Sequence, residues 1–200
     1  MRTRLLLAGL LVGLVAGLLV PVAQATEWPN RRAGLVLGLN LGVGSGQLRL
    51  TGVDEAREYG FAGSARMAYG ISHELLLGVE FNGWGREDEG TRRSYTTTTI
   101  AATWFPKGGS FFVRGGVGSG LASLRLPTDK DGQFLLVDEW GFAISAALGY
   151  EWRLGNTFAL GAQLDTSFID VGTVTLGDDF QEQVKVNYQN LTLALNWYLY

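Results

Sequence analysis

Few side chains in this sequence are of the types that perform chemistry, and the partners that such chemistry requires are missing. His73 is the only histidine, and it stands in a short turn between Ser72 and Glu74. A serine-type hydrolase needs a histidine as its general base, but we interpret His73 as a solvated turn residue. Glu80 and Asp165 could support carboxylate catalysis, although a structural ion pair is the interpretation that we adopt. The sequence therefore predicts that the protein is not an enzyme.

Two glycine-containing segments resemble ligand-binding loops only superficially. Residues 115–120 read GGVGSG, with glycine recurring at every second position and no helix pattern after it. A phosphate-binding loop needs a strand followed by glycines at the start of a helix, so we interpret these glycines as clearance for neighbouring side chains. Residues 129–132, DKDG, lack the further oxygen ligands and the distal glutamate of a calcium loop. The sequence thus predicts neither a metal nor a cofactor.

The elements that must position these residues are strands, and residues 100–120 show the pattern most clearly. Phe111, Val113 and Val117 share one parity, whereas Arg114 lies among glycines on the other. Side chains alternate across a strand with a period of two. An apolar face with an aromatic residue near its end, opposite a small and polar face, is typical of a strand with lipid outside and a narrow polar lumen inside.

The same alternation recurs in eight arms separated by three short turns and four long loops. The arms are expected at 34–44, 61–71, 75–82, 94–105, 111–120, 140–150, 158–168 and 191–199. The long loops are expected at 45–59, 83–93, 122–139 and 170–182. An even-stranded up-and-down barrel has both termini at the end of the short turns, which is the periplasmic end in outer-membrane barrels. The long loops would then face the cell exterior.

Charged residues with inward parity predict an ion-pair set inside this barrel. A barrel of about eight strands has an interior just wide enough for side chains to fill. Arg66, Glu80, Arg114 and Asp165 would form a neutral set there, because buried charges are tolerated only when they are paired. The turn around His73 sets Arg66 opposite Glu80, with β-carbons about 5 Å apart. We therefore expect a salt bridge between these two residues.

The N-terminal segment has the features of a secretory signal. Residues 1–4, MRTR, carry two arginines, residues 5–20 are apolar or glycine, and residues 23–25 form a small-residue triplet, AQA. We expect a signal peptide at 1–25 and one barrel domain at 26–200, with a single membrane anchor as the alternative reading. The chain contains no cysteine, which excludes disulfides and thiolate metal sites. Its net charge of −3 argues against a nucleic-acid partner.

The segments TWFPKGGSFFVRGGVGSG and LALNWYLY resemble the small outer-membrane β-barrel superfamily, the OmpA transmembrane domain and OmpW-like proteins. The resemblance implies an all-β protein, an eight-stranded antiparallel up-and-down transmembrane β-barrel in the outer membrane. It also implies an aromatic C-terminal signal for the barrel assembly machinery, which Trp197, Tyr198 and Tyr200 would carry. Tyr200 departs from the family pattern, since it falls on the opposite parity from Leu199 and the other lipid-facing leucines.

Our leading functional hypothesis is a structural and interaction scaffold that presents four extracellular loops, with a lumen plugged by small residues and salt bridges. The alternative, implied by the OmpW-like resemblance, is a narrow conduit for small molecules, including hydrophobic ones. Expected partners are outer-membrane lipid, lipopolysaccharide and the assembly machinery. The acidic loop tips are interpreted as solvated, although they could bind divalent cations: Glu87, Asp88, Glu89, Asp178 and Asp179. The lumen charges argue against an inverted, periplasmic lipid-binding barrel.

Overall fold

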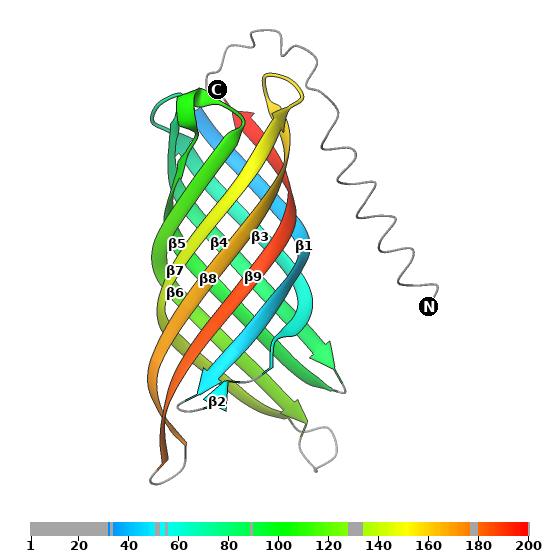
Figure 1. The fold of residues 1–200 in the computed structure, drawn as a ribbon, viewed down its shortest axis with the longest axis vertical. Coiled ribbons are helices and arrows are strands. Elements are labelled where there is room, and N and C mark those ends of the chain that lie inside the picture. The colour runs from blue at the N-terminus through cyan, green and yellow to red at the C-terminus, as the bar shows by residue number, and fades with distance from the viewer. Residues whose placement is uncertain are drawn as a thin grey trace, which may run out of the picture.

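The protein folds as one antiparallel sheet. The computed structural model describes residues 32, 34–50, 53–54, 56–88, 90–127, 134–176 and 180–199, so the expected signal peptide lies outside the described residues. The strands are β1 (Gly34–Leu50), β2 (Val53–Asp54), β3 (Glu58–Gly70), β4 (Leu75–Asp88), β5 (Thr91–Trp104), β6 (Phe111–Pro127), β7 (Phe134–Arg153), β8 (Phe158–Leu176) and β9 (Phe180–Leu199), with a short 3-10 turn, η1 (Pro106–Gly108) (Figure 1). Within these ranges no helix has the length and apolarity to cross a membrane.

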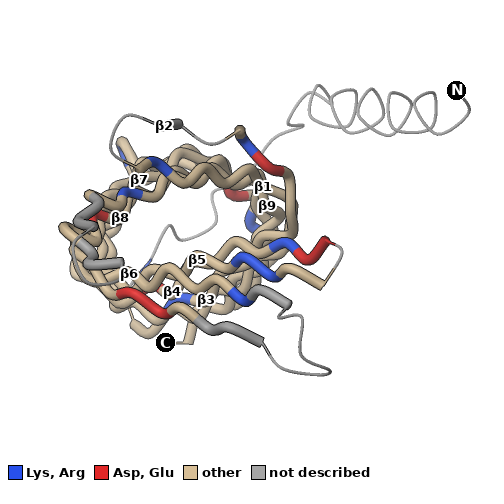
Figure 2. Tube along the Cα trace, turned by 90° about the horizontal axis from the view of Figure 1, so that it is seen from below, with Lys and Arg blue, Asp and Glu red and all other residues tan. Residues whose placement is uncertain are grey.

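The sheet closes on itself, because β1 pairs with both β3 and β9. The two-residue β2 pairs only with the end of β1, so the other eight strands form the ring (Figure 2). Following the pairing once around this ring from Leu35 leads back to β1 at Ser45, ten residues farther on. Such a stagger tilts the strands of a barrel by about 35–45° from its axis. The predicted eight-stranded antiparallel barrel is confirmed.

The outer wall is apolar and has an aromatic band at each end. The band near the short turns contains Tyr69, Trp104, Phe111, Tyr150, Trp152, Phe158 and Trp197. The band toward the long hairpins contains Tyr59, Phe61, Trp140, Phe142 and Phe168. Aliphatic side chains such as Leu41 and Ile100, which are 76% and 71% exposed, lie between the bands. Outer-membrane barrels carry such an apolar belt, about 25 Å tall, between aromatic girdles.

The segments expected to be long loops are largely strand, which corrects the sequence prediction. β1 continues to Leu50, β4 to Asp88, β6 to Pro127 and β8 to Leu176. The hairpin ladders therefore run well past the aromatic band toward the long hairpins. Beyond the lipid both faces of a strand meet water, so a strand there needs no apolar alternation, and the pattern that marks the lipid-facing arms is lost. What the protein presents at this end is a set of long hairpins rather than four long loops.

The close approach of the neighbouring strand β5 requires glycine on the inner face of β6. A β-carbon at Gly118 would lie 2.0 Å from the backbone carbonyl oxygen of Thr98, whereas one at the outward-facing Gly115 would meet nothing within 4 Å. We expect Gly118→Ala to lower the free energy of unfolding by about 2 kcal/mol or more, because backbone cannot move aside as a side chain can. Gly115→Ala should be neutral or slightly stabilising. Urea unfolding in detergent micelles, followed by tryptophan fluorescence, compares the two variants, and equal stability would contradict the expectation.

Candidate functional site

One arginine joins two acids at the centre of the lumen. Arg114 on β6 points inward, and its Nε lies 2.8 Å from Oε2 of Glu80 on β4. Its Nη2 donates a hydrogen bond of 2.9 Å to Oδ1 of Asp165 on β8. Gln163 donates to both oxygens of Asp165, at 3.0 and 2.9 Å. All four side chains are buried, so this cluster ties three strands together across the lumen.

Arg66 does not form the ion pair that the sequence suggested. Arg66 and Glu80 are register partners, as expected. The Arg66 side chain nevertheless lies over Gly38, where an added β-carbon would be 2.8 Å from its Nε, and its Nη2 donates to Oδ1 of Asn196 at 3.1 Å. The predicted direct bridge is therefore wrong: Arg114, rather than Arg66, contacts Glu80, through Oε2, and the missing side chain at Gly38 gives Arg66 another path.

A second acid, which sequence reasoning missed, organises the lumen near the short turns. Glu151 on β7 is fully buried. Its carboxylate accepts a 2.6 Å hydrogen bond from the Tyr198 hydroxyl and a 2.9 Å hydrogen bond from Nδ2 of Asn196. Three guanidinium groups surround it, with nitrogen-to-oxygen distances of 3.8 Å from Arg32, 4.0 Å from Arg66 and 3.8 Å from Arg153. The available signal was parity, since Glu151 continues the inward face of the arm predicted at 140–150.

Arg32 closes the short-turn end of the barrel. It precedes β1 and donates hydrogen bonds to the carbonyl oxygens of His73 at 3.2 Å, Gly108 at 2.8 Å and Gly109 at 2.6 Å. Its guanidinium carbon lies 3.6 Å from the centroid of the Phe105 ring. Burial is the main reason that the pKa of Arg32 lies below its ordinary value. One side chain thereby connects the β3–β4 turn to the β5–β6 turn, and His73 contributes only its backbone.

Apolar side chains fill the lumen on both sides of the central cluster. Near the short turns, the buried cluster contains Val36, Leu76, Phe105, Phe112 and Tyr198. Toward the long hairpins, Trp84 stacks on Tyr95 with ring centroids 5.0 Å apart, and Tyr95 stacks on Tyr188 at 6.4 Å. The lumen is thus filled at three successive levels, namely an aromatic stack, an ion-pair cluster and an apolar plug.

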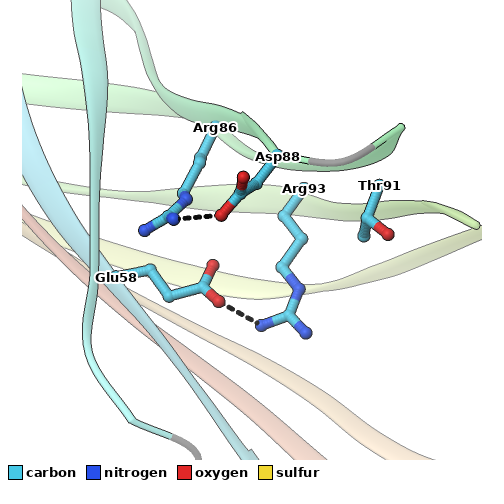
Figure 3. Close-up of a pocket in the computed structure, with 5 residues that line it drawn as sticks. All are labelled: Glu58, Arg86, Asp88, Thr91 and Arg93. Atoms are coloured by element: carbon cyan, nitrogen blue, oxygen red, sulfur yellow. Dashed lines mark hydrogen bonds and ion pairs between the residues drawn. The ribbon is translucent and has the colours of Figure 1, made fainter.

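Above the aromatic stack, the inner faces of three strands form a charged pocket of about 250 Å³ (Figure 3). It is lined by Glu58 of β3, Arg86 and Asp88 of β4, and Thr91 and Arg93 of β5. Nη1 of Arg93 donates a 3.0 Å hydrogen bond to Oε1 of Glu58, and Arg86 pairs with Asp88 on its own strand. The pocket therefore combines two guanidinium groups with two carboxylates at the long-hairpin mouth of the barrel.

The C-terminal aromatic residues fall on both faces of β9. Trp197 lies on the outer wall, where its ring packs edge-on against Phe158 with centroids 5.7 Å apart. Tyr198 points into the lumen and is fully buried, and Tyr200 lies outside the described residues. The 129–132 fragment and three of the acidic loop-tip residues are also outside them. In the part of the chain that the structure describes, no three histidine, cysteine or acidic side chains are grouped as metal ligands would be.

Comparison with known proteins identifies the fold. No protein-family model and no curated protein sequence matches the chain. Among solved structures, the chain resembles Ail, the attachment invasion locus protein of Yersinia pestis, which was solved in complex with the heparin analogue sucrose octasulfate. The TM-score is 0.55, and the identity is 14% over 82% of this chain and 99% of that one. It also resembles Neisserial surface protein A, with a TM-score of 0.58 and 13% identity over 84% and 98% of the two chains. The apolar wall and these neighbours agree with the predicted outer-membrane location, and the chain has the fold of the small outer-membrane β-barrels.

Proposed function

We propose that the protein is a closed outer-membrane barrel that serves as a scaffold and exposes its long hairpins to the cell exterior. The observation that carries this proposal is the filled lumen, with Arg114 bonded to Glu80 and Asp165 between two apolar layers. A channel needs a continuous path for its solute. The rigid ring of strands would instead hold the hairpin ends in fixed positions for contact with other molecules.

The surroundings proposed for this scaffold are lipid and lipopolysaccharide. Beyond the aromatic band toward the long hairpins, the outward-facing positions include two basic register pairs, Arg49 with Lys185 and Arg92 with Arg125. Cationic side chains at this level can contact lipid phosphates, which accept charge-assisted hydrogen bonds. Insertion by the barrel assembly machinery, guided by the C-terminal aromatic residues, is part of the same proposal.

The competing hypothesis is a narrow conduit for small molecules, and ion conductance in planar bilayers separates the two. We expect the wild type to carry no steady current. Arg66→Ala should cause brief conductance events rather than a steady current, because it removes the guanidinium packed between Asn196, Glu151 and Gly38 but leaves the aromatic stack, the central cluster and the apolar plug in place. Arg57→Ala is the matched control, since Arg57 is exposed and bonds only Gln189 among the described contacts. Steady current through the wild type would contradict the scaffold and favour the conduit.

A further inference from the structure

The charged pocket contains a pair of arginines whose positions are unfavourable for strand pairing alone. Arg86 on β4 and Arg93 on β5 are direct register partners and both point to the inner face. Like charges opposite each other in an antiparallel pair destabilise the sheet. The β4–β5 hairpin thus holds two guanidinium groups together at one pocket, as a ligand with several anionic oxygens would need.

The acids that neutralise Arg86 and Arg93 compete only weakly with an anionic ligand for these two arginines. Asp88, the partner of Arg86, has a side chain that is 61% exposed, and the Glu58 side chain is 28% exposed. The Arg86–Asp88 pair is largely open to water, and such ion pairs contribute little because solvent and salt screen them, whereas the Arg93–Glu58 pair is half-buried. A phosphate or sulfate group offers more oxygens and forms bidentate bonds with guanidinium groups. Such a group can therefore displace Asp88 from Arg86 and compete with Glu58 for Arg93.

The surroundings of the pocket indicate what carries the anionic group. Below it the stacked rings of Trp84 and Tyr95 are nearly completely buried, so a ligand entering from outside stops at the mouth. The displaced carboxylates of Glu58 and Asp88, together with the Thr91 hydroxyl, would accept hydrogen bonds from neighbouring hydroxyl groups. A saccharide supplies both features, the hydroxyls and the anionic group, on one small ring.

We propose that Arg86 and Arg93 form a binding site for a phosphate or sulfate group carried by a saccharide. The proposal rests on the proposed function in one respect, namely that the hairpin ends face the exterior. Two sources provide this chemistry, a phosphorylated sugar of lipopolysaccharide in the same membrane and a sulfated glycan outside the cell. The binding assay does not depend on conductance, so failure of the closed-barrel proposal and failure of this one are distinguishable.

Titration of the full chain in detergent micelles tests the site with two probes, a heparin tetrasaccharide and the phosphorylated core oligosaccharide of lipopolysaccharide. Each probe is compared with its desulfated or dephosphorylated form. We expect at least one charged probe to bind, and Arg86→Gln/Arg93→Gln to weaken its binding roughly tenfold or more, since two charge-assisted contacts are lost. The matched control, Arg57→Gln/Lys107→Gln, removes two exposed positive charges that do not line the pocket, and should change affinity much less.

Removing the carboxylates instead of the arginines should change the affinity in the opposite direction, which a merely structural role of the arginines would not predict. Glu58→Gln/Asp88→Asn removes the competing carboxylates, so binding of the charged probe should tighten several-fold and keep its decrease with rising salt. The probe that binds identifies the source of the ligand. The proposal is overturned if neither charged probe binds, if the uncharged forms bind equally well, if the control variant loses as much affinity as the arginine variant, or if the acid variant binds more weakly.

Discussion

Arg114→Ala is expected to lower the free energy of unfolding by about 3–5 kcal/mol, the range found when one partner of a buried ion pair is removed. The reason is that Glu80 and Asp165 would keep their positions in the lumen without the guanidinium that neutralises both. Equilibrium unfolding in urea, with the barrel reconstituted in lipid vesicles or micelles, measures the change. The temperature at which the folded form loses its characteristic mobility on unheated gels gives a second readout.

Two controls separate charge from packing in this experiment. Arg57→Ala removes an exposed arginine and should cost well under about 1 kcal/mol. Combining Arg114→Met with Glu80→Gln and Asp165→Asn removes the charges together, and should recover much of the lost stability because neutral, well-packed groups often replace a buried ionic cluster without loss. If Arg114→Ala were as mild as Arg57→Ala, the central cluster would not hold the three strands together.

The second large loss of stability is expected on replacing Glu151. Glu151→Ala leaves Arg32, Arg66 and Arg153 around an empty position, and it also removes the acceptor for the Tyr198 hydroxyl. We expect a loss of about 3–5 kcal/mol, or failure to accumulate a folded barrel in the membrane fraction. The same unfolding assay measures it.

Glu151→Gln distinguishes the two contributions at this position. The amide oxygen can still accept the Tyr198 hydrogen bond but carries no charge, so its effect should lie between wild type and Glu151→Ala. The interpretation is supported further if a simultaneous Arg66→Met change softens the effect of Glu151→Ala by removing one of the uncompensated cations. A glutamine variant as unstable as the alanine variant would assign nearly all of the stabilisation to the charge of Glu151. A fully stable alanine variant would contradict the conclusion that Glu151 organises the lumen near the short turns.

Alternation of side chains was sufficient to predict the barrel. It determined which residues face lipid, such as Leu41 and Ile100, and which face the lumen, such as Arg66 and Arg114. It does not extend past the aromatic band toward the long hairpins, because strand extensions surrounded by water have no apolar face. The sequence pattern of the hairpin ends is therefore that of loops, although the residues are strand.

The pairing of lumen charges could not be predicted from strand register. Arg66 and Glu80 are opposed, yet each bonds a different partner, because long side chains in a narrow barrel reach past adjacent strands. Glu151 lies one residue beyond the arm predicted at 140–150, because β7 continues to Arg153, and the sequence pattern does not mark it as a lumen residue. Arg32 precedes the first strand, and its contacts with the two turns become evident only once the ring is closed.

The pairing of β1 with β9 determines how such a protein can be built. These are the first and last strands of the ring, so every intermediate that lacks the final strand has two open edges with unsatisfied backbone groups. Hydrocarbon offers no hydrogen-bonding substitute for those groups. A partly assembled sheet therefore has no stable resting place in the bilayer, and insertion must proceed together with completion of the ring rather than strand by strand.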